Sequence, residues 1–254
     1  MTILSAKNLE SFYGPVPALR GVSVDICKGT VTAVIGANGA GKSTLLNTLS
    51  GLLEARFGHI EFLGERIEML SADQVASRGL VLAPEGRQVF PEMSVRDNLR
   101  LGAFRKDARA HEERNLARVL AYFPRLEQRF EQRAGMMSGG EQQMLAIARA
   151  LMAAPDMLML DEPSLGLSPK YVHEIYQILA RINDETGLTV LVAEQNASVA
   201  LSVAHFAYVL ELGRVVLLGP AEEMATKEVL QESFLGSTNV TMDQKRFRRK
   251  KKWR

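Results

Sequence analysis

The sequence has few of the residues that build disulfide frameworks and metal sites. Its 254 residues include one cysteine, Cys27, and four histidines. A single thiol cannot form an internal disulfide and agrees with a reducing cytosolic compartment. His111, His173 and His205 stand in helical or strand patterns without the spacing of metal ligands, so we expect structural or solvated roles for them. Neither redox nor zinc chemistry is indicated.

Long apolar runs are also missing, although 46% of the residues are apolar. Runs such as 31–35 and 158–160 are far shorter than the ~20 residues that span a bilayer. The opening segment MTILSAKNLE has no basic region followed by an apolar stretch, which is the pattern of a secretory signal. We therefore expect neither a membrane span nor a signal peptide.

Excess charge of one sign is confined to the end of the sequence. Residues 237–254 hold eight Lys or Arg against Asp243, whereas the rest of the chain has a net charge of −5. A mildly acidic body argues against a nucleic-acid-binding surface, so no specific nucleic acid partner is expected. For the basic tail we expect disorder; contact with an anionic membrane surface is the second interpretation and RNA contact the third.

Short apolar runs alternate with longer helical patterns, which predicts an α/β fold with a mostly parallel sheet and helices on both faces. The opening segment, with a turn-rich stretch at 13–17, predicts an N-terminal antiparallel β-subdomain. Strand signals vanish from Ser94 to Arg149, where helix formers predict an inserted α-helical subdomain. The expected strands are 31–35, 79–82, 157–160, 188–192 and 206–210.

We expect one domain over residues 1–236. Its RecA-like core would take in about 1–84 and 150–236, with the helical subdomain at about 85–149 and the tail at 237–254.

A phosphate-binding loop follows the first parallel strand. The segment GANGAGKST at 36–44 lies between an apolar strand and the helical run LLNTLSGL, which is the context that a P-loop requires. Its glycines let backbone N–H groups converge on phosphate oxygens, and the next helix adds its positive end. Lys42 would contact the β- and γ-phosphates, and the Ser43 hydroxyl would bind Mg²⁺. The predicted nucleotide ligands are Gly36, Asn38, Gly39, Ala40, Gly41, Lys42, Ser43 and Thr44.

Two acids stand where a later strand ends. In MLMLDE, the carboxylates of Asp161 and Glu162 would emerge at the carboxyl edge of the sheet, where α/β proteins bind ligands. Asp161 suits a metal ligand, directly or through water. Glu162 suits the polarisation of an attacking water.

The segment Met137-Ser-Gly-Gly-Glu141 precedes another helical run, QQMLAIARAL. It offers a hydroxyl and two exposed N–H groups at a helix N-terminus, which again suits an anion. The segment resembles the signature of ABC ATPases, with Met and Glu where the commonest version has Leu and Gln. This resemblance covers residues 1 to about 235. It implies that Ser138, Gly139 and Gly140 contact a γ-phosphate held by the P-loop of a partner subunit.

The same resemblance assigns roles to two further places. Tyr13 matches the aromatic residue that stacks on adenine. Residues 164–167, SLGL, match the loop that crosses to the other subunit.

Two positions depart from the general family pattern. Glu85 stands where a Gln is usual, and Gln195 stands near the usual position of a His. Gln195 can donate a hydrogen bond to phosphate but carries no proton or charge at neutral pH. Glu85 could orient Mg²⁺ or water. A degenerate, non-hydrolysing site is one interpretation, but the retention of Lys42, Ser43, Asp161 and Glu162 favours a subgroup trait.

The segments PEGRQVFPEMSVRDNL, LDEPSLGLSP and VAEQNASVAL resemble the LivF-like ATPases of branched-chain amino-acid importers. Urea and short-amide importers are the alternative. The resemblance implies an ATP- and Mg²⁺-dependent ATPase on the cytoplasmic face of the inner membrane, with Lys42, Glu162 and Gln195 as its catalytic residues and Ser43, Glu85 and Asp161 at the metal. The implied partners are a second ATPase subunit (a LivG-like one or a second copy), two membrane permeases docked near 85–95, and indirectly an extracytoplasmic solute-binding protein.

Two other classes of P-loop protein fit the sequence less well. A soluble ABC ATPase of translation usually carries two nucleotide domains, and one of DNA repair a long coiled-coil insertion; neither is present. A P-loop kinase or GTPase would have no use for the Ser138 motif, and no NKxD-type guanine reader follows the P-loop.

Overall fold

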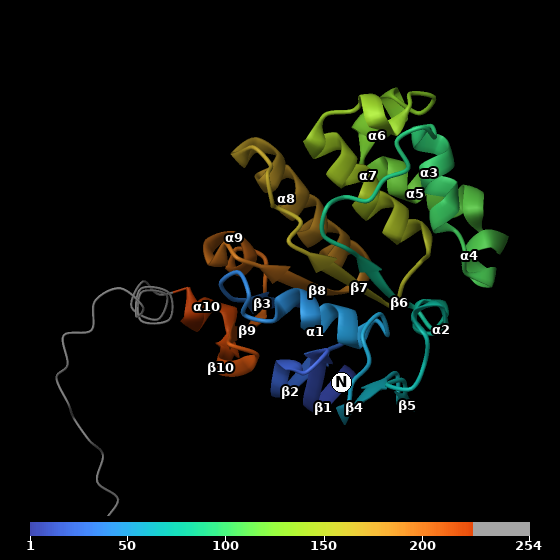
Figure 1. Cartoon of the computed structure of the whole chain (residues 1–254). Coiled ribbons are helices and arrows are strands. Elements are labelled where there is room, and N and C mark those ends of the chain that lie inside the picture. Colours follow the sequence, from blue (N-terminus) through green and yellow to red (C-terminus); the bar gives the residue numbers. More distant parts are fainter. Residues whose placement is uncertain (226–254) are drawn as a thin grey trace, which may run out of the picture.

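A six-stranded sheet runs through the middle of the structure (Figure 1). In this computed structural model residues 1–225 are described, so the predicted basic tail lies outside the described residues. Five strands are parallel, and β10 pairs antiparallel with β9 at one edge. In spatial order the strands are β10 (Arg214–Pro220), β9 (Phe206–Glu211), β3 (Val31–Ile35), β8 (Thr189–Glu194), β7 (Met157–Asp161) and β6 (Leu80–Ala83).

A second, antiparallel sheet forms the lower part of the view in Figure 1. Helix α1 (Lys42–Leu49) lies between the two sheets and contacts strands of both. Its apolar residues Leu45, Leu46 and Leu49 are buried against the second sheet. The strands of this sheet, in spatial order, are β2 (Val16–Cys27), β1 (Thr2–Tyr13), β4 (Phe57–Phe62) and β5 (Glu65–Arg66).

Alternate residues of the central strands serve two separate hydrophobic cores. In β7, Met157 and Met159 pack into the core shared with α1 and the antiparallel sheet, and Leu158 and Leu160 pack into the core on the opposite face. Both faces of the strand are therefore buried, which is why its sequence is an uninterrupted apolar run rather than an alternating one.

A block of helices is inserted between β6 and β7 and forms the upper right of Figure 1. Serine side chains define the starts of its two main helices: Ser94 caps α3, and Ser138 caps α7 in a capping box with Glu141. The elements are α3 (Val95–Gly102), α4 (Lys106–Ala110), α5 (Glu112–Tyr122), α6 (Pro124–Gln128), a 3₁₀ turn (Ala134–Met136) and α7 (Gly139–Met152).

Of the remaining helices, three lie between strands and α10 follows β10. They are α2 (Ala72–Ser77), α8 (Pro169–Thr186), α9 (Ala197–Leu201) and α10 (Ala221–Met224). Within residues 1–225, no helix combines the length and hydropathy needed to cross a bilayer.

The predicted α/β fold class is confirmed. Helix α7 begins at Gly139, three residues before the predicted helical run QQMLAIARAL, because the Ser138 cap lies outside the apolar pattern. The short helices α2, α4 and α6 were not predicted, since five or six residues are too few to show a helical period.

The crossing of α3 and α7 depends on a glycine at the end of α3. A Cβ on Gly102 would overlap the carbonyl oxygen of Arg149 and lie 2.8 Å from the Cβ of Met152. We expect Gly102→Ala to lower the free energy of unfolding by about 1–3 kcal/mol, because backbone must move to admit the methyl group. Urea denaturation measures the change.

Gly219 provides the matched control, because its nearest such neighbour is the Cγ of Met224 at 4.0 Å. Gly219→Ala should change stability by less than about 0.5 kcal/mol. Equal effects of the two substitutions would contradict this account of the helix crossing.

Candidate functional site

The loop between β3 and α1 leads into a helix N-terminus whose backbone N–H groups have no side-chain cap. Gly41, the residue before α1, has φ 107°, and no side chain caps the helix. A Cβ on Gly36 would lie 2.6 Å from the carbonyl oxygen of Leu210, so only glycine fits between this loop and β9. The uncapped N–H groups and the positive end of α1 together suit a phosphate group.

The ammonium group of Lys42 is buried within this loop, with 3% of the residue exposed. Its Nζ donates to the carbonyl oxygens of Gly36 at 2.9 Å and Ala37 at 3.1 Å. It also forms an ion pair with Oε1 of Glu162 at 2.9 Å. Each of the three N–H donors of the ammonium thus has an acceptor.

Two carboxylates meet the loop from the end of β7. The hydroxyl of Ser43 donates to Oδ1 of Asp161 at 3.0 Å. Glu162 follows with φ 45°, a left-handed conformation that non-glycine residues rarely adopt. This bend turns the chain out of the strand at the residue that pairs with Lys42. Backbone strain of this kind concentrates at functional sites.

The environment of Asp161 favours its neutral form. Burial raises its pKa to about 6, and the nearby carboxylates Glu85 and Glu162 add to the increase, while Ser43 and Lys42 oppose it. A hydroxyl and carboxylates gathered at one place are the oxygen ligands that Mg²⁺ prefers. The donor set therefore fits a magnesium ion, whose positive charge would remove the repulsion among these acids.

A cavity of about 290 Å³ opens over the loop. Its lining brings together seven of the predicted site residues, and the additional member, Leu165, comes from the loop at 164–167. The lining consists of Asn38, Gly39, Gly41, Lys42, Ser43, Glu85, Glu162 and Leu165.

The predicted anion-binding turn at 138–140 does not line that cavity. Ser138 donates to Oε2 of Glu141 at 2.8 Å, and its hydroxyl lies 3.3 Å from that of Tyr171. A Cβ on Gly139 would lie within 2.9 Å of the guanidinium of Arg87, and one on Gly140 would overlap the ring of Tyr171. Glycine at 140 is therefore required by the Tyr171 ring, whereas the Arg87 guanidinium is the end of a flexible side chain that could move to admit a Cβ at 139.

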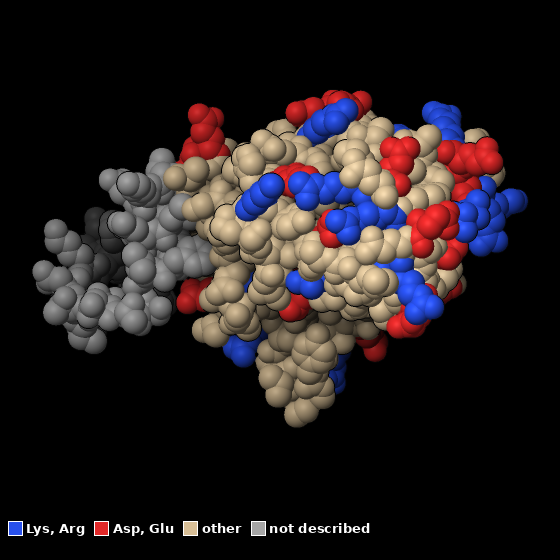
Figure 2. Space-filling model, turned by 90° about the horizontal axis from the view of Figure 1, so that it is seen from above, with Lys and Arg blue, Asp and Glu red and all other residues tan. Residues whose placement is uncertain are grey.

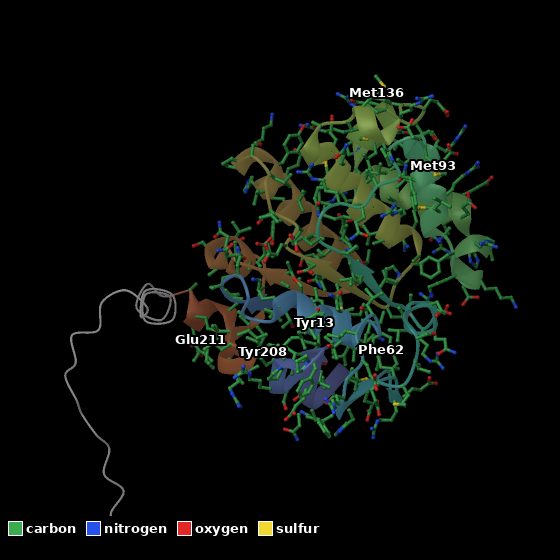
Figure 3. All side chains as sticks on the ribbon, in the orientation of Figure 1. Tyr13, Phe62, Met93, Met136, Tyr208 and Glu211 are labelled. Carbon is green, nitrogen blue, oxygen red and sulfur yellow. The ribbon has the colours of Figure 1, made fainter. Side chains whose placement is uncertain are left out.

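Tyr13 lies away from this turn. Figure 3 shows Tyr13 at the level of α1, above the antiparallel sheet, and Met136, two residues before Ser138, at the far end of the helical block. Tyr13 ends β1 and is 54% exposed. The following strand passes beside the P-loop, since a Cβ on Gly41 would lie 3.2 Å from the carbonyl oxygen of Ala18. Tyr13 itself is not among the residues that line the cavity.

Gln195 directly follows β8 and is exposed. The N–H of Gly36 donates to the carbonyl oxygen of Glu194 at 3.3 Å, which brings the end of β8 to the start of the P-loop. The side chain of Gln195 does not line the cavity. The backbone at the end of β8 is therefore near the P-loop, but the Gln195 side chain is not part of the cavity.

Glu194 is a residue of this region that the sequence analysis missed. Its side chain accepts hydrogen bonds from the backbone N–H and hydroxyl of Ser164, at 3.0 and 2.9 Å, and from the hydroxyl of Tyr176 at 2.8 Å. It is 2% exposed. An acid that ends a fully buried strand must find donors, and this was the available signal.

A phosphate-binding loop with its lysine, a Ser-Asp pair suited to a metal, and a carboxylate able to orient water together define a P-loop nucleoside triphosphatase. Residues 19–165 match the ABC transporter family. The chain is 45% identical to BraG of Pseudomonas aeruginosa, a high-affinity branched-chain amino acid transport ATP-binding protein, over 92% of this chain and 100% of BraG. It is 36% identical to a probable branched-chain amino acid transport ATP-binding protein, LivF, of Archaeoglobus fulgidus, over 92% of this chain and 99% of LivF.

Solved structures give the same assignment. The ADP conformation of MJ1267, an ATP-binding cassette of an ABC transporter, superposes with a TM-score of 0.81 at 29% identity, over 93% of this chain and 99% of that chain. The dimeric structure of the bacterial ABC transporter cassette MJ0796 superposes with a TM-score of 0.75 at 25% identity, over 86% of this chain and 98% of that one. The chain belongs to the ABC transporter family, as an ATP-binding subunit with ATPase activity.

The raised pKa of Asp161 predicts a pH-dependent effect on stability. An unfolded aspartate ionises near 3.8 and Asp161 in the fold near 6, so its ionisation lowers the stability of the metal-free protein as pH rises through this window. In the presence of a chelator, Asp161→Asn should raise the free energy of unfolding by up to about 3 kcal/mol at pH 8 and by little at pH 4. Urea denaturation at both pH values measures the difference.

Asp184, exposed on α8, gives the charge-matched control. Asp184→Asn should leave stability nearly unchanged at both pH values. A stabilisation by Asp161→Asn that is the same at pH 4 and pH 8 would show that the charge of Asp161 is not its cause.

Proposed function

We propose that this chain powers an importer of branched-chain amino acids by ATP-driven closure of two ATPase subunits. One observation carries the mechanism: the P-loop cavity is lined without any of the three residues at 138–140, although these offer a second phosphate-binding turn. A partner subunit can bring its own turn over the cavity. The likeness to BraG over its whole length supports the choice of solute.

Within one subunit we assign the phosphate chemistry to the P-loop and β7. Lys42 would leave Glu162 for the β- and γ-phosphates, because phosphate oxygens carry more negative charge than the carboxylate that it now contacts. Glu162 is then free to orient the attacking water and accept its proton. A magnesium ion held by Ser43, Asp161 and Glu85 would supply positive charge to the phosphate oxygens.

The remaining predicted residues bind other parts of the nucleotide. The N–H groups of Gly139 and Gly140 and the Ser138 hydroxyl would donate to the γ-phosphate held by the partner. Gln195 would donate a hydrogen bond to the same phosphate group from its own subunit. Tyr13 would offer its exposed ring to adenine.

A groove on the helical block suits a cytoplasmic segment of a membrane permease. It has a volume of about 310 Å³ and contains three exposed apolar side chains, Phe90, Leu101 and Phe104. The guanidinium of Arg149 lies 5.2 Å from the centre of the Phe90 ring and donates to the carbonyl oxygen of Gln88 at 2.7 Å. These contacts fix the segment after β6 against α7, so a partner in the groove touches the segment that begins with Glu85.

The proposed assembly contains two ATPase subunits, two permeases and, on the other side of the membrane, a solute-binding protein. The second ATPase is a LivG-like subunit or another copy of this chain. The subunit would lie on the cytoplasmic face of the inner membrane, held there by the groove. The face seen in Figure 2 carries interspersed acidic and basic side chains rather than a basic footprint, which does not favour nucleic acid as a partner.

Replacement of the proposed water-orienting carboxylate tests the ATPase mechanism. Glu162→Gln should lower ATP turnover by at least about 100-fold, because the amide cannot accept a proton. ATP binding should remain, and ATP but not ADP should hold two subunits together in size-exclusion chromatography. The second ATPase subunit is added to the assay if one copurifies with the full-length chain.

Glu113→Gln on the exposed side of α5 makes the same change away from the site and should leave turnover unaltered. Full turnover in Glu162→Gln would remove Glu162 from the proposed role. Failure of ATP to join two subunits would overturn the shared-site mechanism.

Transport by the complex that copurifies with the full-length chain tests the groove and the solute together. In proteoliposomes with the binding protein, the unaltered complex should take up leucine and not urea. Phe90→Ala should reduce leucine uptake several-fold while ATP binding persists, because the backbone of Phe90 stays bonded to the Asn98 side chain.

Phe57→Ala removes an equally exposed phenylalanine from the antiparallel sheet and serves as the control. Uptake of urea instead of leucine would overturn the proposed solute. Equal losses for the two phenylalanine variants would exclude the groove as the docking surface.

A further inference from the structure

Arg87 lies at the junction of two loops that the ATPase mechanism uses. Its guanidinium packs against Gly139, where an added Cβ would lie 2.7 Å from Nη1 and 2.8 Å from Nη2. An added Cβ on Gly166, in the loop after Glu162, would lie 3.8 Å from Nη2. The arginine side chain therefore lies between the start of α7 and the loop at 164–167.

The backbone that delivers this side chain is strained. Arg87 has φ 66° and Gln88 has φ 44°, so two consecutive non-glycine residues occupy the left-handed region. The strained turn is fixed at its far end by the hydrogen bond from Arg149 to the Gln88 carbonyl oxygen. Strain retained in this way points to a function for the side chain that it positions.

No acidic group of residues 1–225 neutralises Arg87. It forms neither an ion pair nor a hydrogen bond with any of these residues. The nearby acid of α7, Glu141, is bonded to Ser138 and pairs with Arg129 at 3.1 Å. All N–H donors of the Arg87 guanidinium therefore remain available to another molecule.

The position of this cation is electrostatically unfavourable within one chain. The N-terminus of α7, a helix of 14 residues, carries partial positive charge, and Arg87 adds a full positive charge beside it. An anion placed over Gly139 would be attracted by both. A phosphate group suits the pair best, since guanidinium binds two of its oxygens at once.

We propose that Arg87 binds the γ-phosphate of the ATP held by the partner subunit, alongside the turn at 138–140. This inference rests on the proposed function, in which that turn closes the partner's P-loop cavity. It deepens the proposal by adding to the shared site a cation that comes from the segment after β6 rather than from α7.

The proposal gives the two ends of one short turn opposite roles. Glu85 lines the P-loop cavity of its own subunit, and Arg87, two residues later, would face the cavity of the partner. A displacement of this turn at one site would then be transmitted to the other. Such a turn would link the occupancy of the two ATP sites without any further moving element.

The test compares charge and shape at this position in the full-length Glu162→Gln protein, with the second ATPase subunit present if one copurifies. Arg87→Met keeps the apolar stem and removes the charge, and Arg87→Lys keeps the charge. We expect Arg87→Met to weaken ATP-dependent association of subunits by at least about 10-fold, because one member of a charge pair is lost. Arg87→Lys should weaken this association less. Analytical ultracentrifugation across a range of protein concentrations gives the dissociation constants of the subunit pairs.

Three controls separate phosphate binding from a structural role. Arg114→Met removes an exposed cation from α5 and should leave association unchanged. The affinity of dilute, monomeric Arg87→Met for ATP and ADP should equal that of the parent, because the proposal assigns Arg87 to the partner's nucleotide. The melting temperature of Arg87→Met without nucleotide should also stay within a few degrees of the parent's.

Each outcome decides one question. If the parent associates with ATP and Arg87→Met associates equally well, the role of Arg87 is overturned while the shared site stands. A loss of ATP affinity in monomeric Arg87→Met would place Arg87 at its own subunit's nucleotide and also overturn the inference. If the parent itself fails to associate, the proposed function fails and the inference fails with it.

Discussion

A primary ammonium group has three N–H donors and loses much hydration when it is buried, so a folded chain must surround it with acceptors. At Lys42 these acceptors come from two separate segments: the carbonyl oxygens of the P-loop and the carboxylate of Glu162 at the end of β7. The cation therefore holds together the two strand ends to which we assign the phosphate chemistry. If a phosphate oxygen replaced Glu162 as an acceptor of Lys42, the Glu162 carboxylate would lose its ion pair while the sheet stayed in place.

The loop after Glu162 is held by a second buried group of hydrogen bonds. The carboxylate of Glu194 binds both the backbone and the hydroxyl of Ser164 and also the hydroxyl of Tyr176 in α8. Consequently the end of β8, the loop at 164–167 and α8 form one connected unit beside the site. Gln195 directly follows Glu194, so a shift of Gln195 toward a phosphate would also move the loop at 164–167 through these hydrogen bonds. The proposed mechanism places this loop against the partner subunit.

Sequence patterns predicted those parts of the candidate site that are contiguous along the chain. The P-loop residues stand between a strand and a helix, and Asp161 and Glu162 end an apolar run, so strand and loop signals alone locate the carboxyl edge of the sheet. Contacts across long stretches of sequence were not predictable in the same way. Glu194 meets Ser164 thirty residues earlier in the chain, and Arg87 meets Gly139 more than fifty residues later. Neither residue belongs to a periodic pattern, so only the assembled fold reveals its partner.

The helical block joins, in one rigid unit, the surfaces proposed for the permease and for the partner's nucleotide. Close packing of Gly102 on the backbone of α7 ties α3 to the helix that Ser138 caps. Arg149, on the same helix, holds the carbonyl oxygen of Gln88 and thereby the strained turn that carries Arg87.

A force applied in the groove at Phe90 would therefore move the turn at 138–140 and Arg87 together, because packed helices shift as bodies rather than deform. Opposing phosphate contacts at the far end of α7 would resist that movement while ATP is bound and release it after the γ-phosphate leaves. The same rigidity that requires glycine at two crowded positions, 102 and 140, is what would allow hydrolysis to be converted into movement of a membrane partner.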